Sequence, residues 1–99
     1  MKIIAIEREI KDVDWSNKSD ILEKEAHQVY EMYLLGYLRE IYFTENNCAV
    51  LILECENIKK ATELLNTLPL VEHHMIRFEI MQLNPYNGYD RIINKTTKD

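Results

Sequence analysis

The sequence predicts an α+β fold in which a four-stranded antiparallel sheet carries two helices on one face. Four short apolar segments have the character of strands, and two longer segments repeat apolar residues at steps of three and four, which is typical of helices. The segments follow the order strand, helix, strand, strand, helix, strand. Only two Gly and two Pro occur, which argues against a turn-dense all-β fold. With 99 residues, we expect a single domain over residues 1–99.

The first third of the chain contains one strand and one helix. Residues 2–8 are a β-branched run bounded by charge, which indicates a strand. The polar segment 11–19 favours a turn, and Ser16 or Ser19 is expected to cap the helix that follows. Gly36 is expected to end this helix in a left-handed conformation. One stripe of the helix carries the apolar positions Leu22, Ala26, Val29 and Tyr33.

The middle of the chain predicts a hairpin followed by a second helix. Residues 37–44 and 48–56 are apolar-rich, and the polar break 45–47 between them has hairpin length and asparagines that tolerate positive φ. Asn57 is placed to cap the second helix, and Pro69 is expected to stop it.

The last strand is expected over residues 75–83, where apolar and charged residues alternate. Pro85 and Gly88 then break the regularity, and the tail from about Tyr89 is expected to be flexible or to cross to a partner subunit. The complete order is the split βαβ arrangement of ferredoxin-like folds.

The two predicted hairpin strands are apolar on both sides. With a three-residue loop, one face carries Tyr37, Arg39, Ile41, Phe43, Ala49, Leu51, Leu53 and Cys55. The opposite face carries Leu38, Glu40, Tyr42, Val50, Ile52 and Glu54. Because helices cover only one face of such a sheet, the other needs a further cover. We expect a second copy of the chain, packed sheet against sheet, in a homodimer or a higher homo-oligomer.

Charge and hydropathy exclude several classes of partner. Lys and Arg total 12 and Asp and Glu total 17, which gives a net charge of -5, the wrong sign for collecting phosphates. No run approaches the roughly 18 apolar residues that a membrane helix needs. The N-terminus becomes charged at Glu7, too early for a signal-peptide core. We therefore expect a cytoplasmic protein that binds neither nucleic acid nor membranes.

With this architecture, the sequence resembles the muconolactone isomerase family of the dimeric α+β barrel superfamily. The resemblance extends from about Lys24 to Leu83, and its motifs are Gly36, the strand segment 39–43, and the segment 67–70 that leads to 76–80. It implies a dimeric barrel with a ligand cleft between the first helix and the sheet. It also implies cofactor-free movement of a proton within a small lactone or acid.

Glu25 and Arg39 are the candidate catalytic residues. Glu25 lies at the edge of the apolar helix stripe, where desolvation would raise the pKa of its carboxyl toward that of a general base. The alternative is that this side chain turns outward or pairs with a lysine. Arg39 falls in an apolar strand, so its guanidinium needs an anion. That anion is either the acid group of a substrate or a protein carboxylate such as Glu25.

Tyrosines and one further carboxylate are candidates for binding a substrate. Tyr30, Tyr33 and Tyr42 could line a pocket with apolar rings and hydroxyl donors, and the alternative is that they only pack. Glu40 could line the barrel or an interface, and the alternative is a salt bridge at the rim.

These residues predict an isomerase that shifts a proton in a small acidic or carbonyl-bearing metabolite. The alternative is a non-catalytic dimeric α+β barrel that binds a small molecule or a partner protein. No glycine-rich phosphate loop occurs, so we expect no nucleotide cofactor. His73 and His74 are adjacent and therefore diverge, and His27 points to solvent, so we expect neither a metal nor another cofactor.

Overall fold

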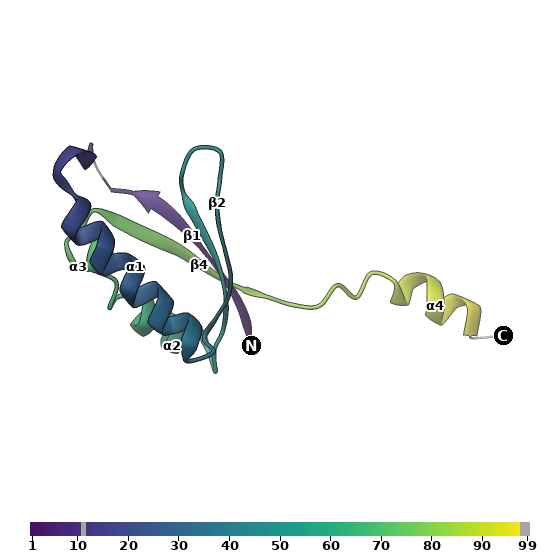
Figure 1. Ribbon diagram of the computed structural model, residues 1–99. Helices are drawn as coiled ribbons and strands as arrows, with labels where there is room; N and C mark the ends of the chain where they lie inside the picture. The colour runs from purple at the N-terminus through teal and green to yellow at the C-terminus, as the bar shows by residue number, and fades with distance from the viewer. Residues whose placement is uncertain (11, 98–99) are drawn as a thin grey trace.

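The computed structural model describes residues 1–10 and 12–97, with side chains as far as residue 93. The described sheet is antiparallel, with the strand order β2-β3-β1-β4. Figure 1 shows α1, α2 and α3 on one face of this sheet, while α4 lies apart. The elements are β1 (Lys2–Glu9), the 3-10 helix η1 (Trp15–Asn17), α1 (Ser19–Leu34), β2 (Leu38–Phe43), β3 (Ala49–Glu54), α2 (Ile58–Leu65), α3 (Pro69–Glu72), β4 (Ile76–Leu83) and α4 (Asp90–Thr97). The predicted α+β fold is confirmed.

The core lies between the sheet and its helices. Strand pairing places every second residue of β1 and β3 on the helix side, where Ile3 faces Leu53 and Ala5 faces Leu51. The helices add Met32 of α1 and Leu65 of α2 to the same buried cluster. On the other side of the sheet, four aliphatic residues remain half-buried without a helix over them: Ile4, Ile6, Val50 and Ile52.

One part of the predicted strand register is wrong. We expected Leu38 to share a face with Val50 and Ile52, opposite Leu53, but a bulge between Leu38 and Glu40 shifts it by one position, so that it pairs with Leu53. Leu38 is buried as a result. The bulge leaves Arg39 exposed at the edge strand. It thus buries the leucine and avoids the cost of placing a guanidinium in the core.

The turns that rest on glycine and asparagine form as predicted. Gly36 adopts φ 87°, and its N–H donates to the carbonyl of Tyr33 while that of Tyr37 donates to Met32. This is a Schellman cap. In the hairpin loop Asn47 takes the positive φ, at 61°. The side chain of Asn57 accepts from the backbone N–H of Lys60 and so caps α2.

Two predicted helix ends are wrong. The residue that precedes α1 is Lys18, without a side-chain cap, because Asp14 instead caps the short η1 helix by accepting from the N–H of Ser16. Pro69 does not stop α2, which already ends at Leu65. It begins α3, where its missing N–H costs nothing because the first turn of a helix has no acceptor for it.

The apolar stripe predicted for α1 is also displaced. Met32 is the fully buried residue of this helix, whereas Leu22 and Tyr33 of the predicted stripe are 40% and 58% exposed. The stripe therefore faces an opening between the helix and the sheet. The helix packs on the core through the buried Met32 and through Val29, a half-buried member of the predicted stripe.

The C-terminal region contains α4, a helix that we did not predict. Residues 84–89 leave β4 in an extended path, and α4 follows well away from the sheet (Figure 1). The predicted tail is thus helical over most of its length, and its last two residues, 98 and 99, lie outside the described part of the chain.

Candidate functional site

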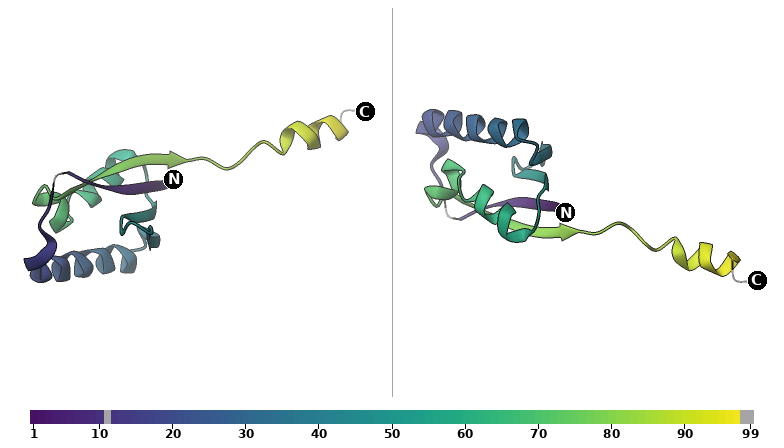
Figure 2. Two further views of the ribbon diagram at one scale, coloured as in Figure 1. Left: turned by 90° about the horizontal axis from the view of Figure 1, so that it is seen from above. Right: turned by 90° about the horizontal axis from the view of Figure 1, so that it is seen from below.

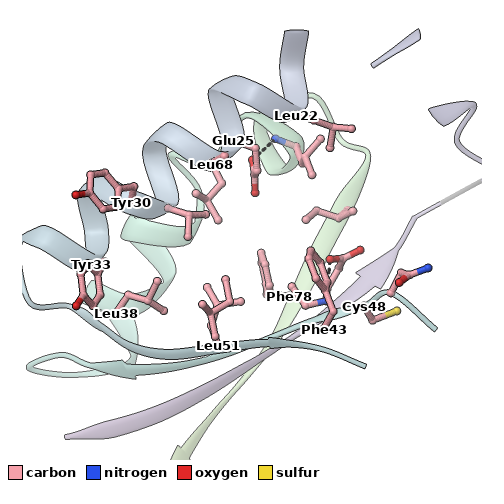
Figure 3. A pocket seen from close by; sticks show the side chains of 18 of the residues that line it. Leu22, Glu25, Tyr30, Tyr33, Leu38, Phe43, Cys48, Leu51, Leu68 and Phe78 are labelled. Atoms are coloured by element: carbon pink, nitrogen blue, oxygen red, sulfur yellow. Dashed lines mark hydrogen bonds between the residues drawn. The ribbon is translucent and has the colours of Figure 1, made fainter. Parts of the chain in front are cut away.

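A cavity of about 1090 Å³ lies between α1 and the helix side of the sheet. In Figure 3 the side chains of Leu22, Glu25, Tyr30 and Tyr33 come from α1. Those of Leu38, Leu51 and Phe43 come from β2 and β3 on the opposite side of the cavity. The walls are mainly apolar. Further residues along them are Glu7, Glu9, Trp15, Val29, Arg39, Glu40, Ile41, Cys48, Leu68, Leu70, Ile76 and Phe78. A cavity of this size and character is typical of sites for small organic ligands.

Glu25 is the half-buried carboxylate of the α1 wall. Its Oε1 atom accepts a hydrogen bond from the backbone N–H of Leu70, at 3.0 Å. Burial raises the pKa of the Glu25 carboxyl, the bond from Leu70 lowers it, and the charge of Glu7 raises it, with a net upward shift. Within the described residues, Oε2 has no hydrogen-bond partner. Glu25 thus has a fixed position, a free oxygen and an increased affinity for a proton.

Two carboxylates of β1, those of Glu7 and Glu9, also line the cavity and accept hydrogen bonds. We did not predict them as site residues. Glu7 accepts from the backbone N–H of Ala49, at 3.0 Å. Glu9 accepts from the indole Nε1 of Trp15 and from the N–H of Val13, both at 3.2 Å. The sequence contained a signal for them. Every second residue of a strand lies on the same face, so Glu7 and Glu9 continue the row of Ile3 and Ala5 on the helix side of β1. Together with Glu25 they make one part of the cavity wall acidic.

Tyrosines and an arginine lie toward the other end of α1. The rings of Tyr30 and Tyr33 stack with centroids 6.2 Å apart. The Nε atom of Arg39 donates to the carbonyl of Gly36, at 2.9 Å. Within the described residues, the guanidinium of Arg39 forms no ion pair. The structural alternative considered above, a pair between Arg39 and Glu25, is therefore not formed.

Arg39 and Glu25 stand far apart along the cavity. Arg39 is tied to Gly36 beyond the end of α1, whereas Glu25 lies in the first half of that helix. At about 1.5 Å per residue, Glu25 and Gly36 are on the order of 16 Å apart along the helix axis. A compact ligand at Glu25 reaches the tyrosines more easily than it reaches Arg39.

Tyr42 and Glu40 do not join the others. The hydroxyl of Tyr42 donates to Oε1 of Glu40, at 2.7 Å, and this bond raises the pKa of the Tyr42 phenol. Tyr42 pairs with Val50, and so lies on the sheet face opposite the cavity. Glu40 borders the cavity beside the bulge, but its carboxylate accepts the hydrogen bond from Tyr42.

The histidines form no metal centre with their neighbours. Among the described residues, no three His, Cys, Asp or Glu side chains are grouped closely enough to hold a metal ion. His73 and His74 are exposed in the turn before β4, and His27 is exposed beside Glu23. The described helices also include none with the length and hydropathy to cross a membrane.

Replacing Glu25 with Gln should stabilise the folded chain at neutral pH. Because the pKa of Glu25 is raised above 4.5 on folding, the folded state binds more protons than the unfolded state above that pH, and stability falls as the pH rises through this window. Gln keeps an acceptor for Leu70 but carries no charge. The free energy of unfolding of Glu25→Gln should therefore exceed that of the parent chain at pH 7.5, and the difference should vanish below pH 4.

Urea denaturation at the two pH values measures this difference, with Glu23→Gln as the control. Glu23 lies on the same helix, but its side chain is mostly exposed, so its replacement should have little effect at either pH. An equal loss of stability in Glu25→Gln at both pH values would contradict the expected burial of charge.

Comparison with known proteins places the fold. No family model matches the sequence, and no curated protein matches it. Among solved structures, muconolactone isomerase superposes with a TM-score of 0.74 at 13% identity, over 89% of this chain and 93% of that chain. A protein from Agrobacterium tumefaciens superposes with a TM-score of 0.50 at 18% identity, over 89% of this chain and 96% of its own. At these identities the likeness establishes the fold alone, and it confirms the muconolactone isomerase-like α+β fold.

Proposed function

We propose that the protein is a cofactor-free isomerase that moves a proton within a small acidic or carbonyl-bearing metabolite. The observation that carries this proposal is the position of Glu25, a carboxylate with a raised pKa and a free oxygen on the wall of an apolar cavity. A base that removes a proton from carbon near neutral pH needs this combination. The fold that the chain shares with muconolactone isomerase is consistent with the same class of reaction.

In the proposed reaction, Glu25 takes a proton from the carbon next to a carbonyl, which leaves an enolate. The same carboxyl then returns the proton to a more distant carbon, so that a C=C bond changes position and no atom is lost. The developing negative charge on oxygen requires a donor. The hydroxyls of Tyr30 and Tyr33 are the nearest candidates along α1, and Arg39 would hold an acid group at the far end of a longer ligand.

Proton NMR in D₂O tests the proposal directly. A panel of small unsaturated lactones and keto acids, muconolactone included, is incubated with the protein, and loss of carbon-bound proton signals is followed. We expect proton exchange with at least one compound. In Glu25→Gln the exchange rate should be at least about 100-fold lower. Glu23→Gln should retain the parent rate. A Glu25→Gln variant that exchanges protons at the parent rate would overturn the assignment.

We propose further that the chain works as a homodimer whose sheets pack face to face. The half-buried aliphatic residues Ile4, Ile6 and Ile52 form the centre of the uncovered sheet face, and Met81 extends it on β4. Charged groups surround this centre, including the ion pair between Arg8 and Glu79, at 3.1 Å. An apolar centre with a polar rim is the usual anatomy of a protein interface.

A second candidate is a binding protein without turnover. The observation that favours it is the bond from Arg39 to Gly36, which keeps the guanidinium away from Glu25. Such a protein would bind compounds of the panel without exchanging their protons, and line broadening of the ligand signals in the same NMR samples would reveal this.

A further inference from the structure

The charged side chains of the cavity lie at its two ends. Figure 2 shows α1 running alongside the strands of the sheet, so positions on the two layers can be compared along one direction. At one end, Glu25 of α1 lies close enough to Glu7 of β1 for the charge of Glu7 to raise the pKa of the Glu25 carboxyl. Glu9 lines the cavity beyond Glu7 on the same strand. The other end carries Arg39, beside the bulge of β2.

Strand pairing gives the distance between these two ends. Leu38 and Ile3 are both paired with Leu53. Arg39 follows Leu38 and therefore lies close to the level of Ile3. Glu7 is four residues further along β1, which corresponds to about 13 Å, and the separation along α1 given above is similar. Because side chains reach inward from both ends, a ligand that contacts both has to span roughly 10 Å.

The space between the two ends has apolar walls. Leu38, Leu51 and Leu68 line it and are almost completely buried. In Figure 3 the side chains of Leu51 and Phe78 lie between those of Leu38 and Phe43. A polar ligand group would lose its hydration here without gaining a hydrogen bond, whereas a hydrocarbon chain gains from burial. The middle of the ligand is therefore expected to be apolar.

Arg39 provides a cation for an acid group. Within the described residues its Nε atom donates to the carbonyl of Gly36, at 2.9 Å, and its two terminal nitrogens have no hydrogen bond or ion pair. Two carboxylates near it have other partners, because Glu40 accepts from Tyr42 and Glu54 pairs with the N-terminal amino group. Among the described residues that line the cavity, Arg39 is the only cation. A guanidinium in this state can bind a carboxylate through two parallel hydrogen bonds.

The opposite end of the cavity is suited to an uncharged group. An acid placed there would face the carboxylates of Glu7, Glu9 and Glu25, and no described cation lines that end. Like charges in such proximity oppose binding and so select against an anion. A carbonyl group carries no charge, and the carbon next to it is the one from which Glu25 would remove a proton.

We propose that the cavity takes an elongated carboxylic acid, with its acid group on Arg39, an uncharged carbonyl at Glu25 and an apolar chain between them. An extended chain advances about 3.5 Å over each three bonds, so roughly eight bonds have to separate the acid carbon from the carbonyl carbon. The position of the carbonyl rests on the function proposed above, whereas the length and the charge pattern of the ligand do not depend on turnover.

Fluorescence titration of Trp15 measures binding without any requirement for turnover, because the chain has a single Trp and this residue lines the cavity. The probe is a straight-chain keto acid with its methyl ketone roughly eight bonds from the carboxyl carbon. Three matched compounds are its methyl ester, the dicarboxylic acid of the same length, and a keto acid with roughly three bonds between the same groups. Near neutral pH, where the free acids are ionised, the dissociation constant of the long keto acid should be at least about 10-fold lower than that of each matched compound.

Variants separate the two ends of the cavity. Arg39→Gln should raise the dissociation constant of the long keto acid about 10-fold and leave that of its methyl ester unchanged. Arg39→Lys retains the charge and should recover part of this affinity. The control is Arg77→Gln, which should change neither value, because Arg77 pairs with Arg8 on the opposite face of the sheet and is exposed. Glu7→Gln keeps an acceptor for Ala49 and should strengthen the binding of the dicarboxylic acid severalfold.

The contrary results separate this inference from the proposed function. A matched compound that binds as tightly as the long keto acid, no binding of that acid, or an equal loss for acid and ester in Arg39→Gln would overturn the ligand class. Proton exchange with small compounds in such a protein would leave the proposed function in place. If instead the long keto acid binds as expected but exchanges no protons, or exchanges them equally in Glu25→Gln, the proposed function fails and the ligand class stands.

Discussion

The Ile4→Glu variant is expected to be a folded monomer at concentrations where we expect the parent chain to be a dimer. Ile4 pairs with Ile52 on one side and with Met81 on the other, so it occupies the middle of the uncovered sheet face. In a face-to-face dimer the substitution would bury two carboxylates without partners. A buried unpaired charge costs about 3–5 kcal/mol, so the dissociation constant should increase about a thousandfold or more.

Sedimentation velocity over a range of concentrations measures this effect. The matched control is Gln82→Glu, which adds the same charge to the same sheet. Gln82 pairs with Ile3 and so lies on the helix side, and it is exposed at the end of β4. The control should remain a dimer. If Ile4→Glu and the parent chain sediment alike, the sheet face is not the interface.

Truncation of Leu53 to Ala is expected to cause a large loss of stability. Leu53 is completely buried and is paired with Ile3 of β1 and Leu38 of β2. Removing its branched end leaves a void that the three paired strands cannot close. Such truncations reduce the free energy of unfolding by about 2–5 kcal/mol, a considerable part of the roughly 5–15 kcal/mol that holds a typical domain together.

Leu22→Ala provides the comparison for this prediction. Leu22 belongs to the apolar stripe that the sequence predicts for α1, but its side chain faces the cavity and is largely exposed. Urea denaturation should show a loss below about 1 kcal/mol for this variant. Equal losses for Leu22→Ala and Leu53→Ala would mean that the cavity wall is packed as tightly as the core.

The fold was predictable because local signals agree with one another. Gly36 and Asn57 end and begin helices through backbone geometry that their own chemistry favours, and the structure contains both caps. The bulge at Arg39 was not predictable from alternation, because it results from competition between burying Leu38 and exposing the charge beside it. Helix α4 was missed because Pro85 and Gly88 precede it, and because Ile92 and Ile93, its apolar residues, are more than half exposed.

The site was predictable only in part. Glu25, Tyr30, Tyr33 and Arg39 all line the cavity. Helix periodicity places Glu25 and Tyr33 on the side of α1 that faces the sheet, whereas Arg39 reaches the cavity from the bulge in β2. Tyr42 lies on the opposite face. Periodicity says which side a residue faces, but it does not give the distance between two residues on different elements. The separation between Glu25 and Arg39, and the bonds that hold each of them, therefore emerged only in three dimensions.

The pH dependence of carbon-bound proton exchange tests most directly the claim that Glu25 is a general base in this cavity. With a compound that the parent chain turns over, the rate in D₂O should increase with pH through an apparent pKa above the ordinary glutamate value of 4.5. It should be lost across the whole range in Glu25→Gln. A profile that Glu25→Gln leaves unchanged, in midpoint and in rate, would contradict the account.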